Sequence, residues 1–247
     1  MLRRLLRDRS GRARNAEDDF QWRGEGVSRL ENLSDIVFAF AVSFLVASAE
    51  VPQTFDELTA SLSGFAAVGF GFGMVLLVWN SHYVFFRRYG LEDSRTVWLN
   101  AVLLFLILLF VYPLRFVAEF TADLALGRFD SMRDVAAVLA LDEIPQLQLV
   151  YSGGFAAVFA VFTLLYRHAS RKADELGLSA VERVLTAERV ATGAVYVGVA
   201  LAAIALAYAL PVRWTFLSFW VYALLGVFIP LVRRPYQTRY RALVDER

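Results

Sequence analysis

The sequence of 247 residues contains no cysteine, which excludes disulfide bonds and thiolate-ligated metal ions or clusters. Its two histidines, His82 and His168, lie far apart in the chain, so a histidine metal site or a Ser-His-Asp triad has little support. The TVGYG filter of ordinary potassium channels and an arginine-rich voltage-sensor helix are also missing. An enzyme is therefore the least favoured class, and no cofactor, resident metal ion or nucleic acid is expected to bind.

Apolar residues are abundant. They make up 58% of the chain, 15% of all residues are aromatic, and the mean hydropathy is +0.50, which is far from an ordinary soluble domain. Six segments each supply roughly 20 apolar residues, enough to cross a hydrocarbon core of ~30 Å. These segments are 33–51, 62–86, 97–120, 148–167, 189–210 and 213–232. The sequence predicts an all-α polytopic membrane protein with six transmembrane helices in a single repeat.

Basic residues indicate how these helices are oriented. If both ends are cytoplasmic, 21 of the 25 basic residues lie on the cytoplasmic side, which the positive-inside rule favours. The first 26 residues lack the apolar core and cleavage site of a signal peptide, so the first helix is expected to act as its own anchor. We predict a cytoplasmic Arg-rich tail at 1–28, a transmembrane domain at 29–232 and a cytoplasmic tail at 233–247.

Small residues recur at helical spacing in two of the predicted helices. Gly69 and Gly73 form a GxxxG pattern, and Ala194, Gly198 and Ala202 form a similar row. Such rows let the backbones of neighbouring helices approach closely. We interpret both as packing faces.

Polar residues cluster near the predicted cytoplasmic ends of the first three helices. Arg29 and Asp35 lie about 240° apart around one helix, so they cannot pair with each other. At the same membrane depth, Trp79 and His82 share one face of the second helix, and Asn100 begins the third. A buried carboxylate is costly in lipid, so these groups should meet. A structural clamp is the favoured interpretation, and a proton relay through histidine is the alternative.

A second stripe lies further along the first helix. Phe40, Ser43, Ala47 and Glu50 are spaced by three, four and three residues, so they share one helical face. If several copies surround an axis, they give an aromatic constriction, a hydroxyl ring and an outer carboxylate ring, which are parts of a cation pore. The alternative is a lipid-buried helix whose Ser43 bonds to its own backbone and whose Glu50 lies among headgroups.

The segment RLENLSD at 29–35 resembles the R-x-x-x-F-S-D signature of the transmembrane protein 175 family, potassium channels of lysosomes and bacteria. The following IVFAFAVSFLV, and later VWNSHYVFFRRY and TVWLNAVLLFLILLFVYP, are similar to the family's first three helices. The similarity extends to about residue 115. It implies a homotetramer of single six-helix repeats in which the first helices line the pore without a carbonyl filter.

The resemblance also implies roles for particular residues. Phe40 stands where the family usually has the isoleucine or leucine of its narrowest layer, and Ser43 stands where a threonine usually contacts the passing K⁺ ion. Leu33 replaces the phenylalanine of the motif, while Ser34 is retained and is expected to belong to the same polar cluster as Arg29, Asp35, Trp79, His82 and Asn100. The resulting hypothesis is a potassium-permeable channel, multi-pass in the lipid bilayer of a bacterial plasma membrane. The alternatives are a proton-coupled transporter or proton pathway, and a non-conducting membrane scaffold whose pore Phe40 keeps shut.

Overall fold

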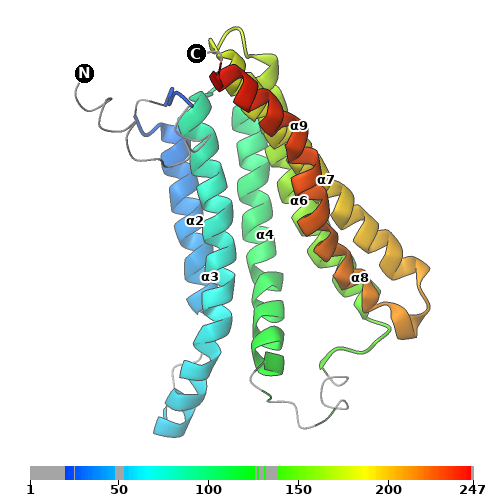
Figure 1. Ribbon diagram of the computed structural model, residues 1–247. Helices are drawn as coiled ribbons and strands as arrows, with labels where there is room; N and C mark the ends of the chain where they lie inside the picture. The colour runs from blue at the N-terminus through cyan, green and yellow to red at the C-terminus, as the bar shows by residue number, and fades with distance from the viewer. Residues whose placement is uncertain are drawn as a thin grey trace.

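The structure, a computed structural model, describes residues 20–24, 26–47, 53–125, 127, 131 and 138–245. Within these residues all regular structure is helical (Figure 1). The elements are α2 (Arg29–Ala47), α3 (Phe55–Tyr89), α4 (Ser94–Ala125), α6 (Ile144–Arg171), α7 (Ala180–Ala209), the short η2 (Val212–Trp214), α8 (Leu217–Trp220) and η3 (Val221–Leu224), and α9 (Leu225–Asp245).

The long helices form an elongated bundle. Helices α2, α3 and α4 stand together on one side, and α6, α7 and α9 on the other (Figure 1). The start of α2, the end of α3 and the end of α9 lie at the same end of the bundle, which we call the basic end. In the described part of the chain, five stretches are long and apolar enough to cross a membrane: Val68–Tyr89, Ser94–Phe120, Ile144–Arg171, Ala180–Ala209 and Val212–Asp245. The prediction of an all-α membrane protein is confirmed.

The last predicted span differs most from the structure. We predicted one helix over 213–232, but two 3₁₀ turns and the short α8 precede α9, which then continues to Asp245. The segment WTFLSFWVY at 214–222 is rich in aromatic and β-branched residues, which lose rotamer freedom in a regular α-helix. Short helical turns therefore precede the last long helix, and that helix ends at Asp245, later in the sequence than the hydropathy indicates.

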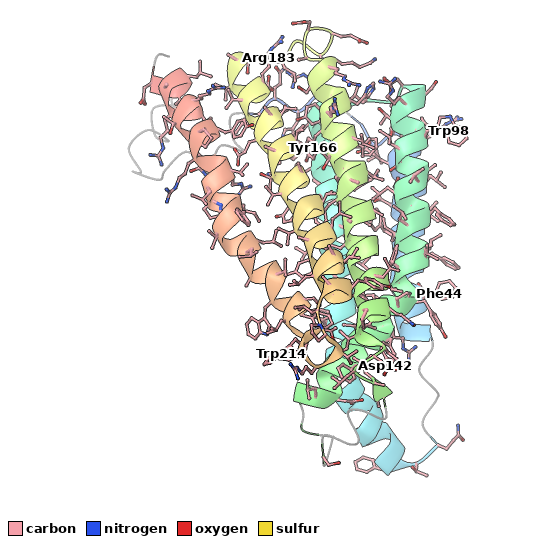
Figure 2. The ribbon with its side chains drawn as sticks, turned by 90° about the vertical axis from the view of Figure 1, so that its right-hand side faces the viewer. Phe44, Trp98, Asp142, Tyr166, Arg183 and Trp214 are labelled. Carbon is pink, nitrogen blue, oxygen red and sulfur yellow. The ribbon has the colours of Figure 1, made fainter. Side chains whose placement is uncertain are left out.

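A core of aromatic side chains lies toward the basic end. Phe85 and Tyr89 of α3 are almost fully buried, and both meet Tyr166 of α6 edge to face, with ring centroids 5.2 Å and 5.9 Å apart. Figure 2 shows Tyr166 near the end that carries Arg183, with Asp142 and Trp214 at the opposite end. This core joins the α2–α4 side of the bundle to the α6–α7 side, because rings of α3 contact a ring of α6. Edge-to-face ring pairs stabilise the fold beyond the effect of the apolar area that they bury.

The predicted packing faces lie open among the residues that the structure describes. A Cβ atom added at Gly69, Gly73 or Gly198 would meet nothing within 4 Å, and Ala194 and Ala202 are exposed. These rows therefore do not pack closely against another helix among the described residues of one chain, and their interpretation as packing faces stays a prediction. Their periodicity is real, but it lies on outward surfaces of α3 and α7.

Close helix contacts occur instead at two other glycines. A Cβ atom at Gly154 of α6 would lie 2.3 Å from the ring of Phe110 in α4. One at Gly193 of α7 would lie 2.2 Å from Oγ1 of Thr163 in α6. Each distance is far below van der Waals contact, so only glycine allows these helices to pack as closely as they do.

We expect Gly193→Ala to destabilise the protein by about 1–3 kcal/mol, because overpacking must displace Thr163. The Thr163 hydroxyl donates to the Phe159 carbonyl at 2.7 Å, so its rotation also breaks a hydrogen bond. The matched control is Gly198→Ala on the same helix, which should be neutral or slightly stabilising, since alanine favours a helix over glycine. Thermal unfolding in detergent compares them, and equal Tm values for the two variants would contradict the prediction.

Candidate functional site

Helix α2 has one face that packs on the chain and one that does not. A capping box starts it, in which Glu31 N–H donates to Ser28 Oγ at 3.1 Å and Ser28 N–H donates to Glu31 Oε2 at 2.9 Å. The buried face contains Ser34, Phe38, Ala41 and Leu45, which follow helical spacing toward α3 and α4. The opposite face exposes large apolar side chains: Leu33, Ile36, Phe40 and Phe44.

Phe40 and Ser43 of the predicted pore stripe lie on this exposed face. The Phe40 side chain is 55% exposed, and its ring stands edge-on to that of Phe44 with centroids 4.7 Å apart. Ser43 donates its hydroxyl proton to the Ala39 carbonyl at 2.9 Å. That backbone bond fits the lipid-buried alternative, yet it leaves the lone pairs of the Ser43 oxygen free to face a cation.

The outer half of the stripe is less completely described. Ala47 is the last residue of α2, and the surroundings of its side chain are not among the described features. Glu50 lies outside the described residues. Helix α2 therefore includes Phe40, Ser43 and Ala47 of the predicted stripe. The ring of Glu50 carboxylates stays a prediction.

A groove runs beside this stripe between α2 and α4. Its volume is about 240 Å³, and it is lined by Phe40, Phe44, Leu108, Val111, Tyr112 and Arg115. Tyr112 is 79% exposed, so the α4 wall of the groove also has a large aromatic surface without cover in the described chain. An exposed apolar surface of this kind on two adjacent helices suits contact with lipid or with another subunit.

The predicted polar residues of three helices meet behind the stripe. Trp79 Nε1 of α3 donates to Asp35 Oδ1 of α2 at 2.8 Å. Separately, Asn100 of α4 lies between two partners: its Nδ2 donates to Ser34 Oγ at 2.9 Å, and its Oδ1 lies 2.9 Å from His82 Nε2. Ser34, His82 and Asn100 are all nearly fully buried. Both links cross helix boundaries, so together they tie α2 to α3 and α4.

The direction of these hydrogen bonds can be followed to a backbone atom. The Ser34 hydroxyl donates to the Leu30 carbonyl at 2.8 Å, so it accepts from Asn100 with its lone pair. Since Asn100 presents its carbonyl oxygen to His82, the imidazole Nε2 carries the proton. We call Ser34, Asp35, Trp79, His82 and Asn100 the polar cluster.

Arg29 does not join the polar cluster. It is exposed at the first turn of α2 and has no hydrogen bond or ion pair to another described residue. It is the first residue of α2, so its long side chain points toward the basic end of the bundle. The expectation that Arg29 belongs to the cluster is not met within one chain.

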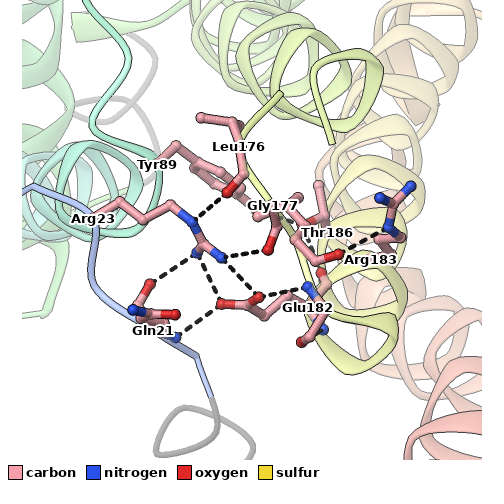
Figure 3. A network of polar contacts seen from close by, with 10 residues as sticks. Gln21, Arg23, Tyr89, Leu176, Gly177, Glu182, Arg183 and Thr186 are labelled. Atoms are coloured by element: carbon pink, nitrogen blue, oxygen red, sulfur yellow. Dashed lines mark hydrogen bonds and ion pairs between the residues drawn. The ribbon is translucent and has the colours of Figure 1, made fainter. Parts of the chain in front are cut away.

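The sequence reasoning missed a second polar network at the basic end. Residues 20–24, which we call the N-terminal strap, cross from α3 to the start of α7 (Figure 3). Arg23 forms a two-pronged ion pair with Glu182, with Nη1–Oε1 and Nη2–Oε2 distances of 2.8 Å and 2.9 Å. Its Nε donates to the Leu176 carbonyl at 2.8 Å, and Gln21 N–H donates to Glu182 Oε1 at 2.9 Å.

Glu182 was detectable in part, because the sequence SAVE at 179–182 has the pattern of a capping box. The structure contains that box, with Ser179 N–H donating to Glu182 Oε2 at 2.8 Å. The partner Arg23 lies 159 residues away, and no local pattern indicates it. The strap is therefore held to α7 immediately before the chain begins α2.

Asp93 forms a third tie, between the start of α4 and the end of α6. Its Oδ1 accepts from the Thr96 backbone N–H at 2.9 Å and from the Thr96 hydroxyl at 2.7 Å. Its Oδ2 lies 2.6 Å from His168 Nε2 and 3.0 Å from Lys172 Nζ. Burial raises the pKa of the Asp93 carboxyl, but the hydrogen bonds from Thr96, His168 and Lys172 outweigh it and hold the pKa well below its usual range.

We expect the stabilising effect of Asp93 to depend on pH. Because its pKa is lower in the folded protein than in the unfolded chain, the stabilisation is complete above the unfolded pKa of about 4 and is lost as pH falls below it. Asp93→Asn keeps a helix-capping oxygen but removes the charge, and should cost about 1–2 kcal/mol at pH 7. Thermal unfolding of both proteins from pH 7 to pH 3 should show the Tm difference shrinking; a constant difference would contradict this.

Comparisons with known proteins agree with this architecture. A family model described as the endosomal/lysosomal potassium channel TMEM175 matches residues 29–110. A potassium channel of Marivirga tractuosa is 35% identical over 167 residues, which cover 66% of this chain and 68% of that protein. A potassium channel of Chamaesiphon minutus is 30% identical over 156 residues, covering 60% and 68% of the two chains.

Solved structures extend the similarity beyond the first three helices. The crystal structure of a threonine-to-alanine variant of the potassium channel MtTMEM175, bound to a nanobody–MBP fusion, matches with a TM-score of 0.80 and 30% identity over 89% of this chain and 97% of that one. A TMEM175 homologue from Chamaesiphon minutus, 24% identical, shares the fold with a TM-score of 0.50 over 82% and 95% of the chains. With the RLENLSD motif at the start of α2, these similarities show that the chain belongs to the TMEM175 family.

Proposed function

We propose that this protein is a potassium-permeable cation channel whose pore is lined by α2 of four identical chains. The observation that carries the proposal is the exposed face of α2, where the Phe40 side chain is 55% exposed and Ser43 is exposed as well. That face lies inside the segment matched to the family, and the relatives are named as potassium channels. Ions move passively down their electrochemical gradient.

Each level of the stripe has a physical role in this mechanism. The Phe40 rings form a narrow apolar constriction that excludes water and resists ion entry. One turn outward, the Ser43 oxygens offer polar contacts to a partly dehydrated K⁺ ion. Ala47 leaves the next level wide, and Glu50 raises the local cation concentration at the outer mouth.

The proposed topology has six membrane spans and both termini in the cytoplasm, in a bacterial plasma membrane. It is supported by the common end of the bundle at which α2 starts and α9 finishes, and by the 21 basic residues that this orientation places inside. The channel domain is 29–232, with tails at 1–28 and 233–247. The described parts of both tails contact the bundle, through Phe20 and through Tyr240, Leu243 and Val244.

The assembly is proposed to be a homotetramer. The exposed aromatic and aliphatic side chains of α2, and the α2–α4 groove beside them, provide apolar surface for a neighbouring subunit. One chain carries a single copy of the motif, so a closed pore wall needs several chains around an axis. Lipid covers the remaining outward surfaces of the helices.

The polar cluster supports a structural role better than a proton pathway. Its hydrogen-bond chain from His82 through Asn100 and Ser34 ends at the Leu30 carbonyl inside α2. A proton relay needs a hydrogen-bonded path that continues from one donor or acceptor to the next. A structural clamp needs only that each buried polar group has a hydrogen-bond partner. We therefore propose that the cluster fixes the pore helix against α3 and α4.

The test is ion flux through the purified full-length protein in liposomes, with K⁺ and Na⁺ gradients compared at matched protein density. Potassium flux above that of protein-free liposomes, larger than sodium flux, is the expected result. Native mass spectrometry in mild detergents should show four 27.8 kDa chains. A monomer in every detergent would contradict the central pore, and collapse of a pH gradient without potassium flux would favour the proton pathway.

A further inference from the structure

Arg23 anchors the N-terminal strap to the α6–α7 side of the bundle. It donates five hydrogen bonds, as many as its guanidinium group has N–H groups. Two go to the Glu182 carboxylate, and the others go to the backbone carbonyls of Gln21, Leu176 and Gly177 (Figure 3). The Glu182 side chain is 3% exposed, so removal of Arg23 would leave a buried carboxylate without its cation.

The N-terminal strap is also fastened to the end of α3. The backbone N–H groups of Arg23 and Gly24 both donate to the Arg87 carbonyl, at 3.1 Å and 3.2 Å. Arg87 Nη1 donates in return to the Gly24 carbonyl at 2.7 Å. The backbones lie close together, because a Cβ atom at Gly24 would lie 3.1 Å from the Phe86 carbonyl oxygen. The strap therefore connects α3 to α7 and has little room to shift.

Two routes lead from the N-terminal strap to α2. The chain itself is the first, because α2 begins five residues after the strap ends. The second is a row of rings: Trp22 meets Tyr83 edge to face with centroids 6.2 Å apart, and Tyr83 stacks on Trp79 at 5.7 Å. Trp79 donates to Asp35 of α2, which lies five residues before Phe40. The position of α2 is therefore tied to the strap both along the chain and across α3.

We propose that Arg23 is a positioning residue for ion flux: through the N-terminal strap it holds α2 where the Phe40 constriction stays narrow. This rests on the proposed function, in which Phe40 of four chains forms that constriction. An apolar constriction excludes water only while it is narrow, so ion flux rises steeply as it widens. When the start of α2 is held less firmly, the constriction takes a wider range of diameters, and the widest of them carry most of the flux. Loss of the Arg23 contacts therefore raises potassium flux.

The experiment measures potassium flux in liposomes at matched protein density. We expect Arg23→Gln to raise the flux about three-fold, within the range by which single substitutions change the coupling between distant sites. Glu182→Gln should act in the same direction, and the double variant should conduct no more than either single variant, because both substitutions break one ion pair. Arg183→Gln is the matched control, since Arg183 bonds to Asp174 and Leu178 rather than to the strap.

Combination with Phe40→Ala separates an effect on the constriction from a loss of folded protein. In that background the constriction is already wide, so Arg23→Gln should leave the flux unchanged. Destabilisation alone would instead lower the flux in both backgrounds, because fewer channels fold. Hydrogen exchange followed by mass spectrometry gives a measure that does not need conduction: residues 29–34 should exchange faster in Arg23→Gln than in Arg183→Gln.

The other outcomes contradict the proposal. A fall in flux in both backgrounds would make the N-terminal strap a structural feature only, and an equal rise in Arg183→Gln would remove the special role of Arg23. Faster exchange without a rise in flux would mean that the strap holds α2 but does not act on the constriction. If Arg23→Gln does not fold, Arg23→Lys takes its place, because lysine keeps the charge but has three donors; its flux should lie above that of the parent.

The same data distinguish failure of this proposal from failure of the channel function. If neither the parent nor Phe40→Ala conducts potassium, the proposed channel function fails, and the role of Arg23 in flux fails with it. If Phe40→Ala raises the flux but neither Arg23→Gln nor Arg23→Lys does, the channel function stands and the role of Arg23 alone is overturned.

Discussion

Replacing Phe40 with alanine should raise potassium flux through the reconstituted protein on the order of ten-fold, which needs a barrier lowered by about 1.4 kcal/mol. Phe40 is the bulky apolar residue at the level where the family resemblance places the constriction, and its ring is exposed on α2. A ring of four phenyl groups excludes water, and alanine widens and wets that level. Because more than half of the Phe40 side chain is exposed, the substitution should leave the fold intact.

Phe105→Ala is the matched control for this experiment. Phe105 is also an exposed phenylalanine, at 64% against 55% for Phe40, but it lies on α4 outside the α2 stripe. Its removal should leave potassium flux unchanged at the same protein density. Equal flux in the parent and the Phe40→Ala variant would mean that the pore does not pass this residue.

Ser43→Ala should act differently from Phe40→Ala. Its oxygen is the polar group one turn further out, and the ion loses a contact that offsets part of its dehydration. Discrimination between potassium and sodium should therefore fall while the apolar constriction remains. Flux measured in parallel with both cations shows whether the two substitutions separate in this way.

Much of α2, the proposed pore helix, could be predicted from local spacing. The three- and four-residue steps that connect Phe40, Ser43 and Ala47 follow from the helical repeat, and the structure continues α2 through all three. The polar cluster could be predicted from membrane depth, because a buried amide and imidazole in lipid need partners at their own level. Asn100 is the centre of its hydrogen bonds, since its amide bonds to residues of two other helices.

The parts that could not be predicted depend on contacts between distant segments. Gly193 and Gly198 lie five residues apart on α7, and only the position of α6 decides that the first is crowded and the second open. Arg23 and Glu182 likewise meet only because the N-terminal strap folds back across α3. A cavity between α3, α7 and α9 forms in the same way, because its lining residues come from three separate helices.

Asn100→Ala should be the most destabilising single substitution in the polar cluster. It leaves the buried His82 Nε2–H without its acceptor and removes the link from α4 to Ser34, and each unsatisfied buried group costs about 1–3 kcal/mol. Asp35→Ala should cost less, because Asp35 is exposed and loses only the bond from Trp79. Asn80→Ala, at an exposed position of α3, is the matched control.

The comparison also decides between a clamp and a proton pathway. If the cluster holds α2 in place, Asn100→Ala lowers both the Tm and the fraction of tetramer in detergent, and the loss is similar at every pH at which His82 is neutral. If the cluster carries protons, the variant keeps the parent's Tm and assembly, and only the pH dependence of flux changes. We expect the first result, because the hydrogen-bond chain ends at the Leu30 carbonyl. His82 Nε2–H donates to Asn100, and the Ser34 hydroxyl donates to the backbone of α2.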